Sequence, residues 1–216
     1  LQAYTSVGSN TTWVTDNHDN VRTVTRYASK VKLSGEYVPE VHGQVALSSA
    51  ELQTGLHRAR AMALLLLTLH GSAYIYAGQE LGLPEVVDLP DQVRTDPSFF
   101  RTQGRVKGRD GCRVPMPWRS FGPTFGFNAQ GGQESWLPQP SDWGQLSVGA
   151  QSEDSSSMLR LYQDILKLRR SLPALQSENL VWVSEPQLGT TNETVLVLER
   201  GDSESGIVKI IVNFGD

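Results

Sequence analysis

Two short apolar runs, each followed by polar residues and separated by helical sequence, constrain the fold of this 216-residue chain most. Residues 11–15 (TTWVT) and 73–78 (AYIYAG) have the β-branched and aromatic composition of strands. Residues 21–30 and 50–69, which lie between them, predict a short helix and a long one. This order predicts β/α units around a parallel sheet, in which the working residues follow the carboxyl ends of the strands.

The long predicted helix carries its own start signal. Ser48 or Ser49 is expected to cap it, and Glu51 in the first turn interacts favourably with the helix dipole. Its second half, residues 61–69, is apolar almost all round, which predicts that it is buried. That run is shorter than the roughly 20 residues needed to span a bilayer, so we expect no membrane partner.

A long stretch with little periodicity, residues 84–153, follows the second predicted strand. So long an irregular segment predicts functional loops or a covering excursion. Its aromatic side chains either fill a satellite core or offer faces on which sugar rings stack. They are Phe99, Phe100, Trp118, Phe121, Phe125, Phe127, Trp136 and Trp143.

The C-terminal part changes character twice. Residues 155–172 predict an amphipathic helix that serines cap and Pro173 ends. Three strands separated by turn residues then predict an antiparallel module, at residues 180–185, 194–200 and 207–214. We therefore expect a barrel-type domain over residues 1–176, including the irregular stretch, and the start of a β domain over residues 177–216.

Charge and cysteine content exclude several classes of protein. The net charge of −4 and the lack of a Lys/Arg-rich run argue against a nucleic-acid partner. Cys112 is the single cysteine, so no internal disulfide is possible, and a reducing, cytoplasmic compartment is favoured. With four scattered histidines and no CxxC pair, neither zinc nor another metal is expected, and nothing indicates an organic cofactor.

Two polar segments are candidates for chemistry, and each has a purely structural alternative. The cluster Asp16–Asn20 could simply cap a helix and form a turn, or its adjacent His18 and Asp19 could both face one cleft. Likewise GRDGCRVPMPW, residues 108–118, could pin a loop through an Arg–Asp pair or present a guanidinium that clamps carboxylates or paired hydroxyls. The residues alone leave both choices open.

Four segments, in the same order, resemble the α-amylase family of glycoside hydrolases, specifically its α-glucosidase and oligo-1,6-glucosidase branch. WVTDNHDNVR is similar to the family's seventh-strand motif. GSAYIYAGQELGL resembles the eighth strand, whose usual form is closer to G-x-P-x-x-Y-x-G-E-E-x-G. GRDGCRVPMPW is similar to a loop of that branch, and LYQDILKLRRSLPAL to the last barrel helix. The resemblance implies an α/β fold: the C-terminal portion of a (β/α)8 (TIM) barrel followed by an antiparallel β domain.

The resemblance also implies roles for individual residues. Asp19 matches a carboxylate that stabilises the transition state and holds hydroxyls of the sugar being cleaved, and His18 matches a histidine that binds the same sugar. Arg113 matches an arginine that closes the pocket around a terminal glucose, which favours release of single glucose units. Asn17 and Arg22 are expected to support these residues from behind, and Arg109 and Asp110 to be loop scaffold. The implied partner is a small α-linked glucoside.

The family's nucleophile and general acid/base find no match in this sequence. The nucleophile belongs to an upstream G-x-R-x-D segment, and Glu80 and Glu85 follow the eighth-strand match, where the acid is not expected. We therefore expect the chain to be the C-terminal part of an α-glucosidase-like enzyme that releases glucose from α-glucosides or short malto- or isomalto-oligosaccharides. Alone, it is expected to be inactive and to self-associate through the open edge of its barrel.

Two other functions remain compatible with the sequence. A transglucosylase or isomerase acting on sucrose, trehalose or maltose would use the same barrel. A non-catalytic carbohydrate-binding or scaffold protein could have kept the barrel without its chemistry.

Overall fold

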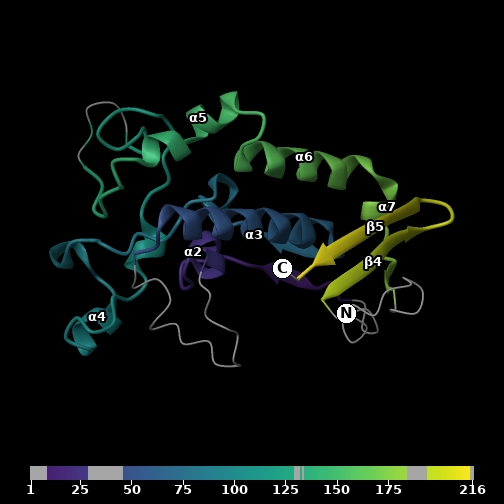
Figure 1. Ribbon diagram of the computed structural model, residues 1–216, viewed down its shortest axis with the longest axis horizontal. Helices are drawn as coiled ribbons and strands as arrows, with labels where there is room; N and C mark the ends of the chain where they lie inside the picture. Colours follow the sequence, from purple (N-terminus) through teal and green to yellow (C-terminus); the bar gives the residue numbers. More distant parts are fainter. Residues whose placement is uncertain (1–8, 29–45, 129–131, 133, 184–193, 215–216) are drawn as a thin grey trace. The chain divides into compact units, whose positions relative to one another are not determined.

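The structure is a computed structural model that describes residues 9–28, 46–128, 132, 134–183 and 194–214 (Figure 1). The chain divides into two compact units. The first comprises Leu1–Val14, Ala61–Tyr74 and Tyr162–Asp216, and the second comprises Thr15–Arg60 and Ile75–Leu161. Each unit is described by itself below.

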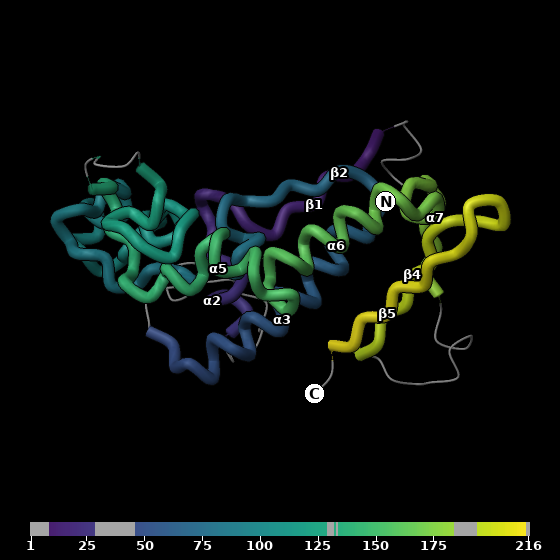
Figure 2. Tube along the Cα trace, turned by 90° about the horizontal axis from the view of Figure 1, so that it is seen from above, coloured from purple at the N-terminus to yellow at the C-terminus, as the bar shows by residue number. Residues whose placement is uncertain are grey.

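The first unit contains the predicted parallel strands. Strand β1 (Thr12–Val14) pairs in parallel with β2 (Ser72–Tyr74), and Figure 2 shows the two side by side. The turn before β2 is fixed at His70, whose carbonyl oxygen accepts from the Trp13 indole N–H at 2.6 Å. Gly71 has φ of +106°, and a Cβ there would meet the Thr11 carbonyl oxygen at 2.3 Å. Only glycine therefore fits between the long helix and β2.

The long helix α3 (Ser49–Thr68) starts where the sequence predicts. The Ser48 hydroxyl accepts from the Glu51 backbone N–H at 3.3 Å, and a Glu51 carboxylate oxygen accepts from the Ser48 backbone N–H at 2.9 Å. This reciprocal pair is a capping box that satisfies two otherwise free donors at the helix start. The predicted burial of the second half holds for Leu66 and Leu67 but is wrong for Leu64, which is 45% exposed.

We expect Ser48→Ala to lower the free energy of unfolding by about 1 kcal/mol, because the cap acceptor is lost. Ser48→Thr keeps the hydroxyl and should remain within about 0.5 kcal/mol of the unchanged protein. Urea denaturation followed by circular dichroism measures both. Equal stability of the alanine and threonine variants would show that the hydroxyl does not hold the helix start.

The first unit also contains the predicted antiparallel module. Strand β4 (Val195–Asp202) pairs with β3 (Leu180–Trp182) on one side and β5 (Gly206–Asn213) on the other, and Figure 1 shows β4 and β5 joined by a tight turn. In that turn, backbone and hydroxyl hydrogen bonds from Ser205 lower the pKa of Asp202 to about 2. Three strands in the predicted order confirm the β module.

Arg200 of β4 ties this module to neighbouring segments of the first unit. Its buried guanidinium donates to the carbonyl oxygens of Thr68 at 2.7 Å and Leu175 at 2.8 Å. Thr68 is the last residue of α3, so the positive side chain meets the negative end of the helix dipole. Leu175 lies in the short helix α7 (Pro173–Gln176), which directly follows the predicted amphipathic helix α6 (Met158–Ser171).

The second unit is mostly irregular, as expected for residues 84–153, and its helices are short (Figure 1). Among its described residues, three α-helices lie wholly within it, α2 (Thr23–Ala28), α4 (Pro97–Arg101) and α5 (Val148–Glu153), and α3 belongs to it up to Arg60. Single 3-10 turns are η1 (Gln79–Leu81), η2 (Asp91–Val93), η3 (Asp110–Arg113) and η4 (Trp143–Leu146). Its hydrophobic core is formed by Leu81, Leu83, Val86, Leu89, Val114 and Trp143.

The segments that follow the two parallel strands meet inside the second unit. The Gln79 side-chain amide donates to the Thr15 hydroxyl at 2.8 Å, and its oxygen accepts from the Tyr76 backbone N–H at 3.1 Å. Because this turn begins at Tyr76, β2 ends at Tyr74 rather than at the predicted residue 78. No helix in the described part of the chain is long and apolar enough to cross a membrane.

Candidate functional site

Within the cluster Asp16–Asn20, the first residue caps a helix and the following residues form a projecting turn. Asp16 is buried, and its carboxylate accepts from the backbone N–H of Thr23 at 3.1 Å, so it caps α2. The Asn17 side-chain oxygen accepts from the Asp19 backbone N–H at 2.8 Å and bends the chain. Beyond this bend, the side chains of His18 and Asp19 are 69% and 49% exposed. The structural alternative from the sequence is therefore realised by Asp16 and Asn17, while a shared cleft for His18 and Asp19 stays a prediction.

The Asp19 carboxylate is the centre of a charged cluster. One of its oxygens accepts from Arg109 Nη1 at 2.8 Å and from Arg113 Nη2 at 3.1 Å, and the other lies 3.5 Å from His18 Nε2. Desolvation raises the pKa of Asp19. The charge of His18 and the hydrogen bonds from both arginines lower it by more, so the pKa lies below its ordinary value. Asp19 is therefore a fixed negative charge, half open to a ligand.

Arg113 joins the two polar segments that the sequence singled out. Its Nε donates to the His18 carbonyl oxygen at 2.8 Å while its Nη2 reaches Asp19. Only 28% of its side chain is exposed. The structure thus brings Asp19, His18 and Arg113 together although 94 residues separate Asp19 from Arg113.

Arg109 does more than the scaffold role assigned to it from sequence. Besides its contact with Asp19, it donates through its backbone N–H at 2.9 Å and through Nε at 2.5 Å to one oxygen of Asp96. Asp96 is fully buried. Burial raises the pKa of Asp96, but the hydrogen bonds from Arg109 and Ser98 outweigh this and hold it far below its ordinary value. A buried carboxylate therefore fixes the guanidinium that grips Asp19.

Asp110 lies behind this pair, as a scaffold residue should. It is buried, and its carboxylate accepts from the backbone N–H groups of Thr95 at 2.9 Å and Asp96 at 3.1 Å. Gly108 completes the arrangement, since it has φ of +75° and a Cβ there would meet Asp96 Cβ at 2.6 Å. Residues 108–110 therefore contact Asp96 both at its backbone N–H and at its side chain.

Arg22 connects three segments of the second unit. Its buried guanidinium donates to the carbonyl oxygens of Ala77 at 3.0 Å and Val114 at 3.4 Å, and it lies 5.3 Å from the centre of the Tyr76 ring. Val114 directly follows Arg113, and Arg22 itself lies three residues after Asp19. Arg22 therefore links both halves of the charged cluster to the loop after β2, a geometry consistent with its expected supporting role.

Glu85 reinforces the same junction and was not predicted from sequence as a supporting residue. Its carboxylate accepts from the Arg22 backbone N–H at 3.0 Å, and its own backbone N–H donates to the Thr25 hydroxyl at 2.8 Å. A Cβ on Gly111 would meet its other oxygen at 2.4 Å. Burial raises the pKa of Glu85 to about 7, although the hydrogen bond and charge of Arg22 oppose this.

The raised pKa of Glu85 predicts a pH dependence of stability. Between the ordinary value of 4.5 and about 7, the folded protein keeps a proton that the unfolded chain has lost. Folding therefore binds protons in this window, and the free energy of unfolding should fall as pH rises, by on the order of 3 kcal/mol in total. The measurement is urea denaturation at several pH values between 4.5 and 7.5.

Comparison of two variants isolates this contribution. Glu85→Gln removes the titrating group and should flatten the fall in stability. Glu153→Gln, at an exposed glutamate that ends α5, should leave the profile unchanged. Parallel profiles for the unchanged protein and Glu85→Gln would contradict the assignment.

A parallel pair of strands, each followed by polar segments that meet, together with an antiparallel sheet, agrees with the expected part of a (β/α)8 barrel and an attached β module. Residues 2–178 match the family model described as "Alpha amylase, catalytic domain". The chain belongs to the α-amylase family, and the predicted family and fold class are confirmed.

Individual relatives give the same picture. The chain is 33% identical over 171 residues to a probable alpha-glucosidase of Rhizobium meliloti, which covers 79% of this chain and 26% of the relative. It is 27% identical over 172 residues to an oligo-1,6-glucosidase of Parageobacillus thermoglucosidasius, covering 72% and 26%. Among solved structures, the alpha-glucosyl transfer enzyme XgtA superposes with a TM-score of 0.71 at 28% identity, covering 98% of this chain and 34% of XgtA. The chain thus spans about a quarter to a third of the length of these relatives.

Proposed function

We propose that this chain forms part of the sugar-binding site of a retaining α-glucosidase-type glycoside hydrolase. One observation carries the proposal: Asp19 is an ionised, half-exposed carboxylate held by Arg109, Arg113 and His18. Relatives whose names describe α-glucosidases support the substrate class. In this proposal Asp19 stabilises the transition state, while His18 and Arg113 bind the sugar.

The chemistry of glycoside cleavage explains why a fixed carboxylate is useful. Retaining enzymes pass through an oxocarbenium-like state between two carboxyl groups about 5 Å apart, one a nucleophile and the other a general acid/base. Positive charge develops on the sugar ring, and a preorganised negative charge lowers its energy. Asp19 would act in this way without bonding to the sugar covalently. The proposal assigns neither carboxyl role to a described residue, and Glu85 is already engaged with the start of α2.

The donors and acceptors of the cluster suit vicinal hydroxyl groups. The second Asp19 oxygen, which lies 3.5 Å from His18 Nε2, can accept a hydrogen bond from a sugar hydroxyl, and His18, which is largely exposed, can donate or accept beside it. Arg113 is anchored to the His18 carbonyl and so stands at a fixed side of the sugar. We propose that it limits the site to a terminal glucose of an α-glucoside or of a short malto- or isomalto-oligosaccharide.

Transfer of glucose to a second sugar is a second candidate function. It is favoured by the likeness to XgtA, an alpha-glucosyl transfer enzyme that is 28% identical to this chain. Both outcomes share the proposed role of Asp19, because the two reactions differ only in the molecule that accepts the glucosyl group.

Product analysis separates these functions. The full-length protein is incubated with maltose, isomaltose and sucrose, and the products are resolved by chromatography. Free glucose as the main product supports hydrolysis, and new oligosaccharides or isomeric disaccharides support transfer. Failure to convert any of the three sugars would overturn the proposal and favour a non-catalytic carbohydrate-binding protein.

A further inference from the structure

Two carboxylates and two guanidiniums are joined by ion pairs around Asp19. Arg109 Nη1 lies 2.8 Å and Arg113 Nη2 lies 3.1 Å from the same Asp19 carboxylate oxygen. Arg109 Nε lies 2.5 Å from the carboxylate of Asp96. The charges of these four side chains therefore cancel. His18, whose Nε2 lies 3.5 Å from the other Asp19 oxygen, adds a positive charge only when it is protonated.

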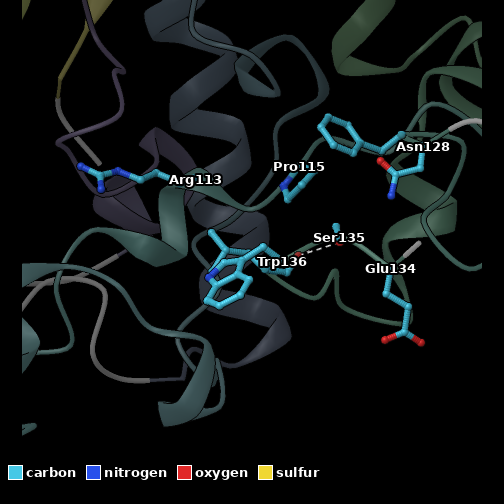
Figure 3. Close-up of a pocket in the computed structure, with 8 residues that line it drawn as sticks. Arg113, Pro115, Asn128, Glu134, Ser135 and Trp136 are labelled. Atoms are coloured by element: carbon cyan, nitrogen blue, oxygen red, sulfur yellow. Dashed lines mark hydrogen bonds between the residues drawn. The ribbon is translucent and has the colours of Figure 1, made fainter. Parts of the chain in front are cut away.

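The two arginines of this cluster lie in different surroundings. Arg113 lines a pocket of about 530 Å³, and Figure 3 shows it at one end of that pocket. Arg109 and Asp96 are not among the described residues that line this pocket. Asp96 is fully buried, so its carboxylate meets Arg109 inside the second unit, on the side that is closed to solvent.

Helix capping accounts for one of the two carboxylate oxygens of Asp96. Its Oδ1 accepts from the Ser98 backbone N–H at 2.8 Å, at the start of α4. Its Oδ2 accepts from Arg109 twice, from the backbone N–H at 2.9 Å and from Nε at 2.5 Å. Burial raises the pKa of Asp96, but these hydrogen bonds lower it by more, and the hydrogen bond and charge of Asp96 in turn raise the pKa of Arg109. Both side chains are therefore charged at neutral pH.

The balance of charge matters for the chemistry proposed at Asp19. Positive charge develops on the sugar in the oxocarbenium-like transition state, and a fixed negative charge beside it lowers its energy. Two guanidiniums on Asp19 without a second carboxylate would give the cluster a net positive charge and offset much of this stabilisation. Asp96 removes the excess, because it shares the guanidinium of Arg109.

We propose that Asp96 is a positioning residue for the reaction, which holds Arg109 and balances its charge so that the negative charge of Asp19 remains effective toward the sugar. The inference rests on the proposed function, in which Asp19 stabilises the transition state. Asp96 makes no contact with the sugar and acts through Arg109. Arg109 can then fix the position of Asp19 with little loss of the carboxylate's electrostatic effect.

Asp96→Asn in the full-length protein tests the role of this charge. Asparagine caps a helix about as well as aspartate, so the start of α4 is kept while the charge of Arg109 is no longer balanced. The kcat for p-nitrophenyl α-glucoside should fall about tenfold, the size expected for one unit charge at a moderate distance. KM should change by no more than about twofold, because the bound substrate is uncharged and positive charge develops only in the transition state. An unchanged kcat would overturn the inference.

A double variant separates charge balance from structural support. Asp96→Asn combined with Arg109→Gln removes one charge of each sign, so that Asp19 and Arg113 remain as a balanced pair. Its kcat should recover to within about threefold of the unchanged protein, a strongly non-additive result. If Asp96 only supported the structure, the double variant would be at least as slow as Asp96→Asn. A folded double variant with a lower kcat than predicted overturns the inference. The test survives if Asp96→Asn unfolds, because the double variant leaves no unpaired charge at the buried position.

Asp91→Asn is the matched control. Asp91 lies on the same irregular stretch, but its side chain is 65% exposed and paired with Lys107. Its kcat and KM should stay within about twofold of the unchanged protein. Asp19→Asn distinguishes the inference from the proposed function. If Asp19→Asn is slow and Asp96→Asn is normal, the inference alone fails. If Asp19→Asn has a normal kcat, the proposed function fails, and the inference fails with it.

Discussion

Asp19→Asn is expected to lower turnover of an α-glucoside by the full-length protein by about 100-fold or more. The substitution keeps the size of the side chain and removes the negative charge that would face the oxocarbenium-like transition state. Substrate affinity should change much less than turnover, because the charge acts mainly when positive charge develops on the sugar. Initial rates on p-nitrophenyl α-glucoside and maltose give kcat and KM separately.

A second aspartate provides the matched control. Asp91 is also exposed and paired with a basic side chain, Lys107, at 3.1 Å, but it lies away from the lining of the pocket and from Asp19's partners. Asp91→Asn should retain activity within about twofold, as a surface substitution. Circular dichroism and thermal unfolding should match the unchanged protein for both variants. A near-normal kcat for Asp19→Asn would remove Asp19 from the catalytic machinery.

Arg22→Met should destabilise the protein by about 3 kcal/mol. The methionine fills similar space, but the carbonyl oxygens of Ala77 and of the buried Val114 lose their donor, and Tyr76 loses its cationic neighbour. Each unsatisfied buried acceptor costs about 1–3 kcal/mol. Urea denaturation measures the change in the free energy of unfolding.

Arg58, which makes a similar contact at the surface, is the control for Arg22. Arg58 is exposed and donates to the Tyr27 carbonyl oxygen at 2.9 Å, where water can replace it. Arg58→Met should cost no more than about 0.5 kcal/mol. Similar losses for the two variants would mean that Arg22 contributes only an ordinary surface hydrogen bond. Arg22→Lys should recover part of the loss, since one ammonium cannot reach both carbonyls in the geometry of a guanidinium.

The regular elements of this fold were predictable because their signals are local. The β-branched run at residues 11–15, the serine–glutamate start of α3 and the spacing of apolar residues in α6 each depend on neighbours within a few positions. The second strand was predicted too long because its end is set by Gln79, whose side chain receives the Tyr76 backbone N–H. Leu64 was predicted to be buried because a hydrophobic pattern indicates preference for a core but supplies no packing partner.

The site was predictable only in part, for a related reason. Asp19, His18 and Arg113 came from motifs whose residue types match a known chemistry. Asp96, which holds Arg109, lies in a stretch without periodicity, and the contact spans 13 residues of irregular chain. Its single local signal is the Asp-Pro-Ser start of α4, where it also accepts from the Ser98 backbone N–H. Such a signal predicts a helix cap and gives no indication that the other carboxylate oxygen holds a guanidinium.

The two contacts of Arg109 restrict which substitutions this chain can accept during evolution. One guanidinium serves two carboxylates, a buried one at Asp96 and a half-exposed one at Asp19. Replacement of Asp96 alone would leave Arg109 without its buried carboxylate partner. Replacement of Arg109 alone would leave the buried Asp96 carboxylate without its guanidinium partner, which is strongly unfavourable. Positions 96 and 109 should therefore covary among related sequences as a charge pair, whereas position 19 should vary only where its proposed role in sugar binding is lost.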